Sequence, residues 1–187
     1  MFFIMKKITL GYTIGRFNPL HLGHVSMLNP MIKDNDYSLI LVGSANQQRT
    51  EKNPLTYAER AHLLTHLYPN TIVLPLNDFN DEQAWINEVD RKIKETLSIL
   101  NIDFEQAEVN LYTGGAQKGE DQSLRKMWCE PLGHNVIPVH LDLDLSATVV
   151  RDHFYKKEME HIVDMLPENV YKFLDNFSKQ QDFNNIY

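Results

Sequence analysis

Short, almost wholly apolar runs alternate with segments of helical periodicity along this 187-residue chain, and this alternation limits the possible folds more than any other feature. The run Tyr37–Val42 reads Tyr-Ser-Leu-Ile-Leu-Val, which is typical of a strand buried on both faces. Similar runs predict strands at residues 8–14, 72–76, 109–112 and 136–141. Such strands, separated by helices, indicate an α/β fold with a doubly wound parallel sheet.

Helix starts and apolar stripes fill the intervals between these runs. Thr56 and Glu59 have the spacing of a capping box, which predicts that a helix begins there. Beyond Asp81 a single apolar stripe predicts a long helix through Ile86, Val89, Ile93, Leu97 and Leu100. A helix after Leu20 is expected to end or kink early at Pro30. Further helices are expected at residues 121–129, 158–165 and 168–177.

Composition excludes several classes of protein. With 25 Asp and Glu against 18 Lys and Arg, the net charge of −7 argues against generic binding of nucleic acid or anionic membranes. The single cysteine, Cys129, excludes an intramolecular disulfide and a zinc finger. There is no apolar run of membrane-spanning length, and the first residues make a poor signal peptide, so a cytoplasmic protein is expected. The length predicts one domain over residues 1–187, with a core at about 8–154 and a helical part at about 155–178.

Polar residues gather in the loop after the first predicted strand, which reads Gly15-Arg16-Phe17-Asn18-Pro19-Leu20-His21-Leu22-Gly23-His24. Such loops lie at the edge where open parallel sheets bind ligands. His21 and His24 fall on one face if a helix has begun, which predicts a donor-rich cradle for a polyphosphate. Capping or solvent-facing histidines are the alternative, while a zinc site lacks further ligands. The glycine patterns of dinucleotide-binding and P-loop proteins are absent.

A second polar cluster lies near the other end of the chain, at Leu145-Ser146-Ala147-Thr148-Val149-Val150-Arg151. Ser146 suits the N-cap of a helix, Thr148 its first turn and Arg151 the next turn. Free amide groups, hydroxyls and a guanidinium at one helix start describe an anion site. On its own the pattern equally fits an ordinary helix start.

Together the two clusters resemble the His-x-Gly-His and Ile-Ser-Ser-Thr-x-x-Arg motifs of the nucleotidylyltransferase superfamily. The segments Gly43-Ser44-Ala45-Asn46, Arg49-Thr50, Asn53-Pro54-Leu55-Thr56 and Glu59-Arg60 are similar to the nicotinamide mononucleotide (NMN) adenylyltransferases of archaeal type. They are equally similar to the adenylyltransferase domain of bifunctional enzymes with a Nudix domain, for which 187 residues leave no room. Leu76-Asn77-Asp78-Phe79-Asn80-Asp81, followed by Trp85, matches the same families. The sequence departs from their motifs at Asn18, usually Gln, and at Ala147, usually Ser.

The resemblance implies a Rossmann-like nucleotidylyltransferase fold with C-terminal helices and an enzyme that transfers AMP from ATP to the 5′-phosphate of NMN. The products are NAD and pyrophosphate, and Mg²⁺ bound mainly through ATP phosphates and water is the implied cofactor. The resemblance gives catalytic roles to His21, His24 and Arg151. It assigns ATP binding to Gly15, Arg16, Phe17, Gly23, Thr113, Gly114, Lys118, Ser146 and Thr148. It assigns NMN binding to Ser44, Asn46, Arg49, Asn53, Arg60 and Trp85.

Several of these residues also have a possible structural role. Trp85 could close the edge of the core, Arg60 could cap a helix face, and the glycines after the fourth strand could serve a turn. No partner pattern surrounds Cys129, His134, His140, His153 and His161, which favours core or surface roles. Competing functions are transfer to another phosphorylated small molecule, a class I aminoacyl-tRNA synthetase fragment that lacks its signature loop, and a non-catalytic NAD or ATP sensor. Homo-oligomerisation stays open.

Overall fold

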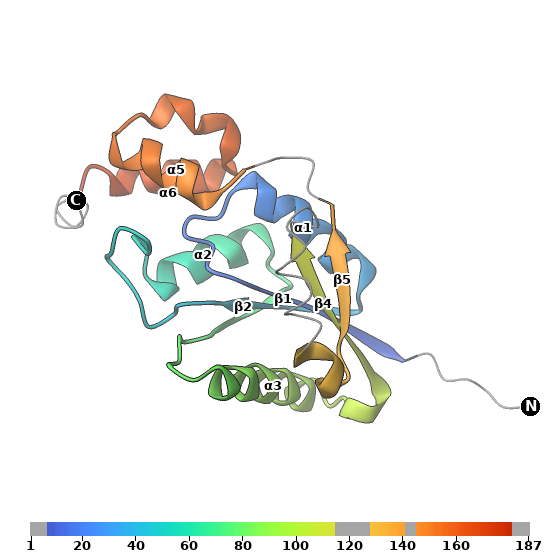
Figure 1. The fold of residues 1–187 in the computed structure, drawn as a ribbon. Helices are drawn as coiled ribbons and strands as arrows, with labels where there is room; N and C mark the ends of the chain where they lie inside the picture. The colour runs from blue at the N-terminus through green and yellow to red at the C-terminus, as the bar shows by residue number, and fades with distance from the viewer. Residues whose placement is uncertain (1–6, 115–127, 141–144, 181–187) are drawn as a thin grey trace, which may run out of the picture.

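The computed structural model, which describes residues 7–114, 128–140 and 145–180, has a five-stranded parallel sheet in the order β3-β2-β1-β4-β5 (Figure 1). The strands are β1 Ile8–Gly15, β2 Tyr37–Val42, β3 Ile72–Pro75, β4 Ala107–Gly114 and β5 Asn135–Val139. All neighbouring pairs are parallel. The apolar runs therefore predicted all five strands, although β4 extends two residues beyond its predicted run at each end.

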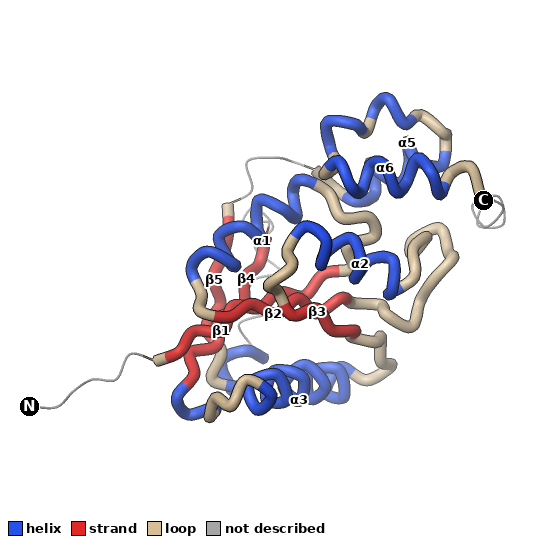
Figure 2. The backbone as a smooth tube through the Cα atoms, turned by 180° about the vertical axis from the view of Figure 1, so that it is seen from behind, coloured by secondary structure: helices blue, strands red, loops and turns tan. Residues whose placement is uncertain are grey.

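Helices cover both faces of this sheet, with α3 on one side and α1 and α2 on the other (Figure 2). The helices are α1 Leu22–Asp34, α2 Tyr57–Leu67, α3 Glu82–Ile99, α5 Ala147–Tyr155 and α6 Glu168–Phe177. In β2, Ile40 and Val42 join a core cluster with α1, α2, α5 and α6, whereas Leu39 and Leu41 join one with α3. Alternate strand residues thus enter opposite cores, which confirms the doubly wound α/β sheet.

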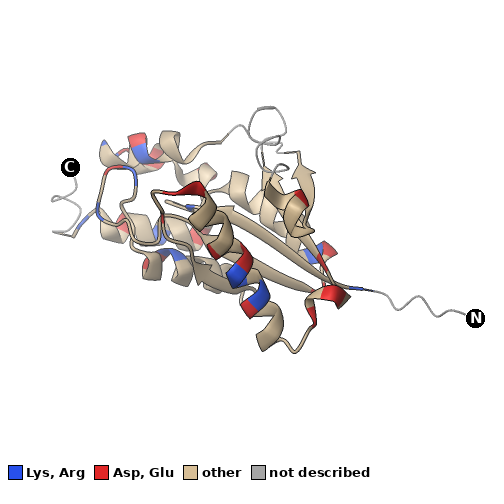
Figure 3. Ribbon diagram, turned by 60° about the horizontal axis from the view of Figure 1, so that its bottom comes forward, with Lys and Arg blue, Asp and Glu red and all other residues tan. Residues whose placement is uncertain are grey.

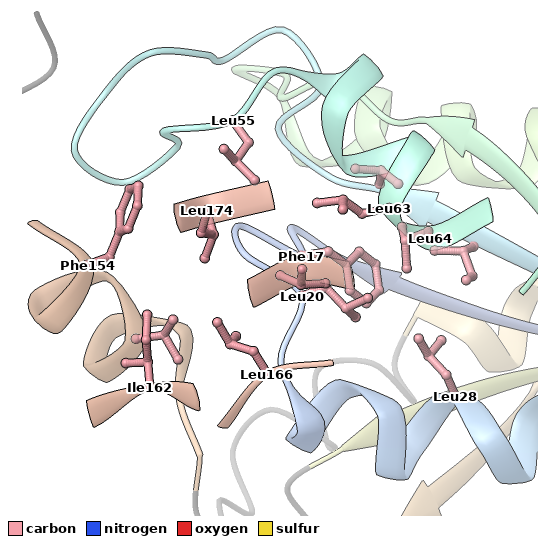
Figure 4. Packing of buried hydrophobic residues seen from close by; sticks show 14 of the residues in the cluster. Phe17, Leu20, Leu28, Leu55, Leu63, Leu64, Phe154, Ile162, Leu166 and Leu174 are labelled. Atoms are coloured by element: carbon pink, nitrogen blue, oxygen red, sulfur yellow. The ribbon is translucent and has the colours of Figure 1, made fainter. Parts of the chain in front are cut away.

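The strand order reverses between β1 and β4, because the chain leaves β3 through α3 and returns beside β1. Open α/β sheets bind ligands beyond the carboxyl ends of their strands at such a switch point. The loop after β1 begins at this position. Its apolar members Phe17 and Leu20 are almost fully buried and lie among the side chains of the larger core cluster (Figure 4).

Side chains cap three helix starts, and the sequence predicted two of these caps, at Thr56 and Ser146. Thr56 Oγ1 accepts from the Glu59 N–H over 3.2 Å, and the Glu59 carboxylate accepts from the Thr56 N–H over 2.8 Å, which completes the capping box of α2. Asp81 accepts from the N–H of Ala84 over 2.8 Å at the start of α3. Ser146 caps α5 through the Val149 N–H over 3.4 Å.

Two helix predictions were wrong. Helix α1 continues through Pro30 to Asp34, because fully buried Leu28 and Met31 hold its last turns on the sheet and the Asn35 amide donates to the Met31 carbonyl over 2.8 Å. Residues 158–165 form short 3₁₀ turns at Met159–His161 and Val163–Met165 instead of an α-helix. Met159 and Ile162 are buried three residues apart, which matches the three-residue turn of a 3₁₀ helix. Most of the helix predicted at 121–129 lies outside the described residues.

The outer face of α3 carries charges of both signs (Figure 3). Arg91 pairs with Glu88 over 2.7 Å, and Lys94 pairs with Asp90 over 2.7 Å. These i,i+3 and i,i+4 pairs mark a solvated helix face. Within the described part of the chain, every helix is too short or too polar to cross a membrane.

Candidate active site

The two polar clusters of the sequence meet in space. Nη1 of Arg151, in α5, donates to the main-chain carbonyl of Asn18 over 3.0 Å. Leu145 packs over Gly23, where an added Cβ would lie 3.5 Å from the Leu145 Cβ. The loop after β1 and the start of α5 therefore form one site, with the first turns of α1 and α5 both contributing to it.

Glycine allows the tight path of the loop after β1. A Cβ on Gly15 would lie 2.8 Å from the ring of Phe17, which folds back over it. Phe17 has a φ of 49°, a left-handed conformation that burial of its ring in the core holds in place. The same fold leaves Arg16 exposed at the mouth of the loop. Within the described chain, the Arg16 guanidinium has no hydrogen-bond or ion-pair partner and is available to a ligand.

His21 and His24 form a stacked pair at the start of α1. Their ring centroids lie 3.7 Å apart, and the His24 ring also packs against Phe17 at 4.8 Å. The main-chain N–H of His21 donates to Nδ1 of His24 over 3.3 Å. An added Cβ on Gly23 would lie 3.0 Å from the His21 ring, so a larger residue here would push that ring from its place by a few tenths of an ångström. The sequence motif thus encodes a packing arrangement as well as two imidazoles.

Both histidines are neutral at pH 7. Burial, followed by the charge of Arg151, lowers the pKa of His21 to about 4. Burial is the larger cause and the electrostatic effect of His21 the smaller cause that hold the pKa of His24 well below 6.5. Because Nδ1 of His24 accepts a hydrogen bond, its proton resides on Nε2, which is then a donor. Nδ1 of His21 is buried and finds no partner among the described residues, an arrangement that a ligand or water would complete.

Hydroxyl groups and cations lie at the same edge of the sheet as this pair. Nη2 of Arg151 donates to Thr148 Oγ1 over 3.1 Å, so its two terminal nitrogens are spread between Thr148 and Asn18. Burial, and then the charge of nearby Arg16, lower the pKa of Arg151, and the weaker opposing effects of Asp152 and Glu51 do not cancel this shift. Thr113, at the end of β4, is buried, and its Oγ1 has no hydrogen-bond partner in the described part of the molecule. Gly114 closes β4, and Lys118 lies outside the described residues.

The loop at residues 43–56 carries most of the residues to which the resemblance gives NMN binding. Ser44, with a φ of 48°, donates through Oγ to Asp78 Oδ1 over 3.0 Å. The Asn46 side chain accepts from the Asp78 N–H over 2.9 Å and donates to its carbonyl over 3.4 Å. Asp78 therefore holds both polar residues of this loop. Sequence reasoning missed that role, although Asp78 lies in the segment quoted with Trp85.

Arg49, Asn53 and Arg60 are engaged in holding this loop. Arg49 pairs with both oxygens of Glu59 over 2.6 and 2.7 Å and lies 4.7 Å above the ring of Phe177. Asn53 Oδ1 accepts from the Asn18 amide over 3.4 Å. Arg60 is 1% exposed and donates to four main-chain carbonyls, those of Arg16, Gly43, Ser44 and Thr56. Each of these three side chains therefore has a structural partner in the loop or beside it.

Trp85 lies in the first turn of α3, on the opposite side of the sheet from α1 and α2. It is partly buried against the smaller core cluster and meets Trp128 edge to face, with ring centroids 5.5 Å apart. A hollow of about 450 Å³ lies beside the pair, between the start of α3 and residues 128–132. Because helix starts and strand ends share one edge in a βαβ unit, Trp85 lies at the same edge of the sheet as the loop at residues 43–56.

The donor set favours phosphate over a protein-bound metal ion. Among the described residues, no three His, Cys, Asp or Glu side chains converge on a possible metal position. Guanidinium groups, hydroxyls and a neutral imidazole donor are instead the groups that bind phosphate oxygens. A divalent cation here would be held mostly by phosphate oxygens and water, as is usual for magnesium with nucleotides.

Comparisons with known proteins agree with this fold. A nicotinamide-nucleotide adenylyltransferase from Thermoplasma volcanium is 34% identical over 85 residues, covering 42% of this chain and 47% of that protein. A protein of the same name from Methanolobus tindarius is 33% identical over 82 residues, with 42% and 47% covered. The aligned chain thus spans about half the length of these curated relatives.

A solved structure shares the fold at low sequence identity. It is a bifunctional NMN adenylyltransferase/ADP ribose pyrophosphatase from Francisella tularensis, complexed with AMP and a manganese ion, which superposes with a TM-score of 0.75 and 20% identity. The match covers 96% of this chain and 52% of that one. The model of one family, described as cytidylyltransferase-like, matches residues 12–186, which include both polar clusters, the second half of β1 and the other four strands. This chain belongs to the cytidylyltransferase-like family.

Proposed function

We propose that this protein transfers AMP from ATP to the 5′-phosphate of nicotinamide mononucleotide, forming NAD and pyrophosphate. The observation that carries the proposal is the junction of the His21–His24 pair with Arg151, which gathers phosphate-binding donors at the switch point of the sheet. The names of the relatives from Thermoplasma volcanium and Methanolobus tindarius support the choice of nucleotide substrates.

The chemistry needs positioning and charge neutralisation more than proton transfer. An oxygen of the acceptor phosphate forms a bond to the α-phosphorus of ATP, while the bond from that phosphorus to the α–β bridging oxygen breaks. Pyrophosphate leaves with the electron pair. Because the acceptor phosphate is already anionic at pH 7, no general base is required. What the chain supplies is oriented donors that meet charge as it develops.

We assign the donors by their geometry. Neutral His24 donates from Nε2 toward the reacting phosphoryl group, and His21 completes the cradle. Arg151, with Thr148 and Ser146, holds the departing pyrophosphate, and Gly23 keeps the approach open. Arg16, which is exposed and unpaired among the described side chains, reaches the phosphates from the mouth of the loop. Gly15, Phe17, Thr113 and Gly114 shape the ATP side, and Lys118 belongs to it by resemblance.

The acceptor nucleotide lies, in this proposal, along the loop at residues 43–56 and toward α3. Ser44 and Asn46 contact the acceptor, and Trp85 faces its pyridinium ring. Arg49, Asn53 and Arg60 act by holding the loop, which their own contacts support. Mg²⁺ bound through ATP phosphates and water would neutralise charge on the triphosphate. The manganese ion named with the Francisella tularensis structure supports a divalent cation.

The test is an assay of the purified full chain with Mg²⁺, ATP or CTP, and a panel of phosphorylated acceptors that includes NMN and nicotinic acid mononucleotide. Pyrophosphate and the adenylylated product should form in equal amounts from ATP and NMN, and Arg151→Ala should abolish most of both. Transfer from CTP alone, or to an acceptor without a pyridine ring alone, would replace the proposal by another transferase activity. Tight ATP or NAD binding without any pyrophosphate would make the protein a sensor.

A further inference from the structure

Asn18 lies at the junction of the two clusters and is 1% exposed. Its main-chain carbonyl accepts from Arg151 Nη1 over 3.0 Å, on the side of the proposed pyrophosphate site. Its side chain takes no part in that hydrogen bond and instead bonds to the loop at residues 43–56. One residue thus contacts both parts of the site with different groups.

The side-chain amide of Asn18 pairs with both main-chain groups of Leu55 in that loop. Oδ1 accepts from the Leu55 N–H over 3.1 Å, and Nδ2 donates to the Leu55 carbonyl over 3.4 Å. Nδ2 also lies 3.4 Å from Asn53 Oδ1. Leu55 is fully buried, so its two main-chain groups depend on protein partners. Only a primary amide offers a donor and an acceptor side by side for this pairing, which accounts for Asn at this position.

The partner segment is itself fixed to the rest of the molecule. Thr56, directly after Leu55, caps α2 through Glu59. Tyr155, one turn after Arg151 in α5, donates to the Glu51 carbonyl over 2.8 Å. The Asn18 amide therefore presses the loop after β1 against a rigid support, and this fixes the direction of the carbonyl that Arg151 uses.

We propose that Asn18 is a positioning residue, whose side-chain pairing with Leu55 sets the carbonyl that orients Arg151 for pyrophosphate. The proposal rests on the proposed function only in taking Arg151 as a pyrophosphate ligand. Loss of the side-chain pairing frees the peptide between Asn18 and Pro19 to tilt, and the Arg151 guanidinium then loses one of its two fixed ends.

The test is a double-mutant cycle read by calorimetric titration of inorganic pyrophosphate in Mg²⁺ buffer, without turnover. Asn18→Leu, which keeps the branched shape but removes both polar atoms, should weaken pyrophosphate binding by about 10- to 100-fold, the range of one lost buried hydrogen-bonding group. In an Arg151→Ala background the same change should weaken it less than about twofold, because the residue acts through Arg151. Equal weakening in both backgrounds overturns the proposal.

Two further variants protect the cycle. Asn18→Asp keeps the shape and the acceptor but loses both donors, so it should also weaken binding and replaces Asn18→Leu if the latter does not fold. Tyr68→Phe removes a hydrogen bond to the Asn29 side chain, which lies outside this chain of contacts, and it should change pyrophosphate affinity less than twofold. Weakening by Tyr68→Phe equal to that of the Asn18 variants would overturn a specific role.

The inference and the proposed function fail separately. A wild-type chain that binds pyrophosphate, shows the cycle and yet forms no NAD would sink the proposed function alone. Full NAD synthesis with unchanged pyrophosphate affinity in Asn18→Leu would sink the inference alone. Failure of the wild-type chain to bind pyrophosphate would also overturn the inference about Asn18.

Discussion

The main-chain N–H of His21 donates to Nδ1 of His24 over 3.3 Å while the two rings stack at 3.7 Å. One backbone bond therefore selects the tautomer of the second histidine and leaves its Nε2 as a donor, and among the described residues no carboxylate bonds to this ring. Burial keeps the ring neutral, since the pKa of His24 lies well below 6.5. The pair is a donor that works without carrying a permanent charge.

If His24 meets charge that develops at the α-phosphoryl group, His24→Ala should lower kcat by roughly 10²-fold or more and change the KM for ATP much less. His24→Gln, whose amide nitrogen can stand near the position of Nε2, should recover part of the rate. His24→Asn, which reaches only the Nδ1 position, is the matched control and should not. Steady-state kinetics decide this, and a loss confined to KM would make His24 a ground-state ligand.

Arg151→Lys should not rescue Arg151→Ala. The guanidinium spans Asn18 and Thr148 with separate nitrogens at 3.0 and 3.1 Å, and a lysine ammonium cannot keep both ends fixed while it faces an anion. Both variants are expected to lose at least about 10²-fold in kcat/KM, the size of effect seen when a preorganised charge-stabilising donor is lost. Turnover of the lysine variant close to wild type would show that a point charge suffices.

Trp85→Ala should raise the KM for NMN by about 3- to 30-fold, because an indole face attracts a pyridinium cation by roughly 0.5–2 kcal/mol and also buries area against it. Trp85→Phe should recover part of that loss, and the KM for ATP should hardly change. Thermal unfolding of the variants tests the alternative that Trp85 is a core residue, because Trp85 also contacts Trp128 edge to face. A large fall in the melting temperature with an unchanged KM for NMN would make Trp85 a core residue only.

Arg60→Met should lower the free energy of unfolding by about 2–4 kcal/mol, since several main-chain carbonyls lose a charged donor and each unsatisfied buried acceptor costs about 1–3 kcal/mol. Urea denaturation of the two chains measures the difference. Arg91→Met, on the exposed face of α3, is the matched control, and its loss should stay below about 1 kcal/mol. Similar losses for both arginines would contradict a special role for Arg60.

Stability should fall between about pH 6.5 and pH 4, in part through His134. This buried residue accepts or donates at Nδ1 with Tyr12 over 3.0 Å, and burial lowers its pKa to about 4. In that interval the unfolded chain binds a proton at His134 and the folded chain does not, so acid favours unfolding. His134→Gln should reduce the slope of unfolding free energy against pH by up to about 1.4 kcal/mol per unit.

Urea titrations at several pH values measure that slope. His140→Gln, a change at an exposed histidine six residues further along, is the matched control. An unchanged slope in His134→Gln would show that other groups account for the acid sensitivity.

Patterns that depend on one element were predicted from the sequence, and contacts between elements were not. Apolar runs place all five strands because burial on both faces leaves few polar residues in them. The caps at Thr56 and Ser146 are local and were predicted, and Asp81 was predicted as the start of its helix. The prediction that α1 ends or kinks early at Pro30 was wrong because burial of Leu28 and Met31 against the sheet outweighs the effect of the proline.

The same limit applies to the candidate site. His21, His24 and Arg151 were found from motifs, and the structure brings them together. The role of Asp78 depends on a hydrogen bond to Ser44, 34 residues earlier, and the ring of Phe177 reaches Arg49 from the last helix. Partners so far apart leave no periodic signal in a single sequence, so the contacts through which Arg49 holds the loop were not predicted beside its expected ligand role.

The bond between Arg151 and Asn18 joins residues 133 positions apart, and this has a consequence for how the protein comes into being. A growing chain on the ribosome carries both histidines early, yet has no Arg151 beside them until more than a hundred further residues have been made. Contacts of such long sequence separation form late and slowly in folding. A cut between β4 and β5 would place the two histidines and Arg151 on different fragments, so the candidate site would form only where the two fragments associate.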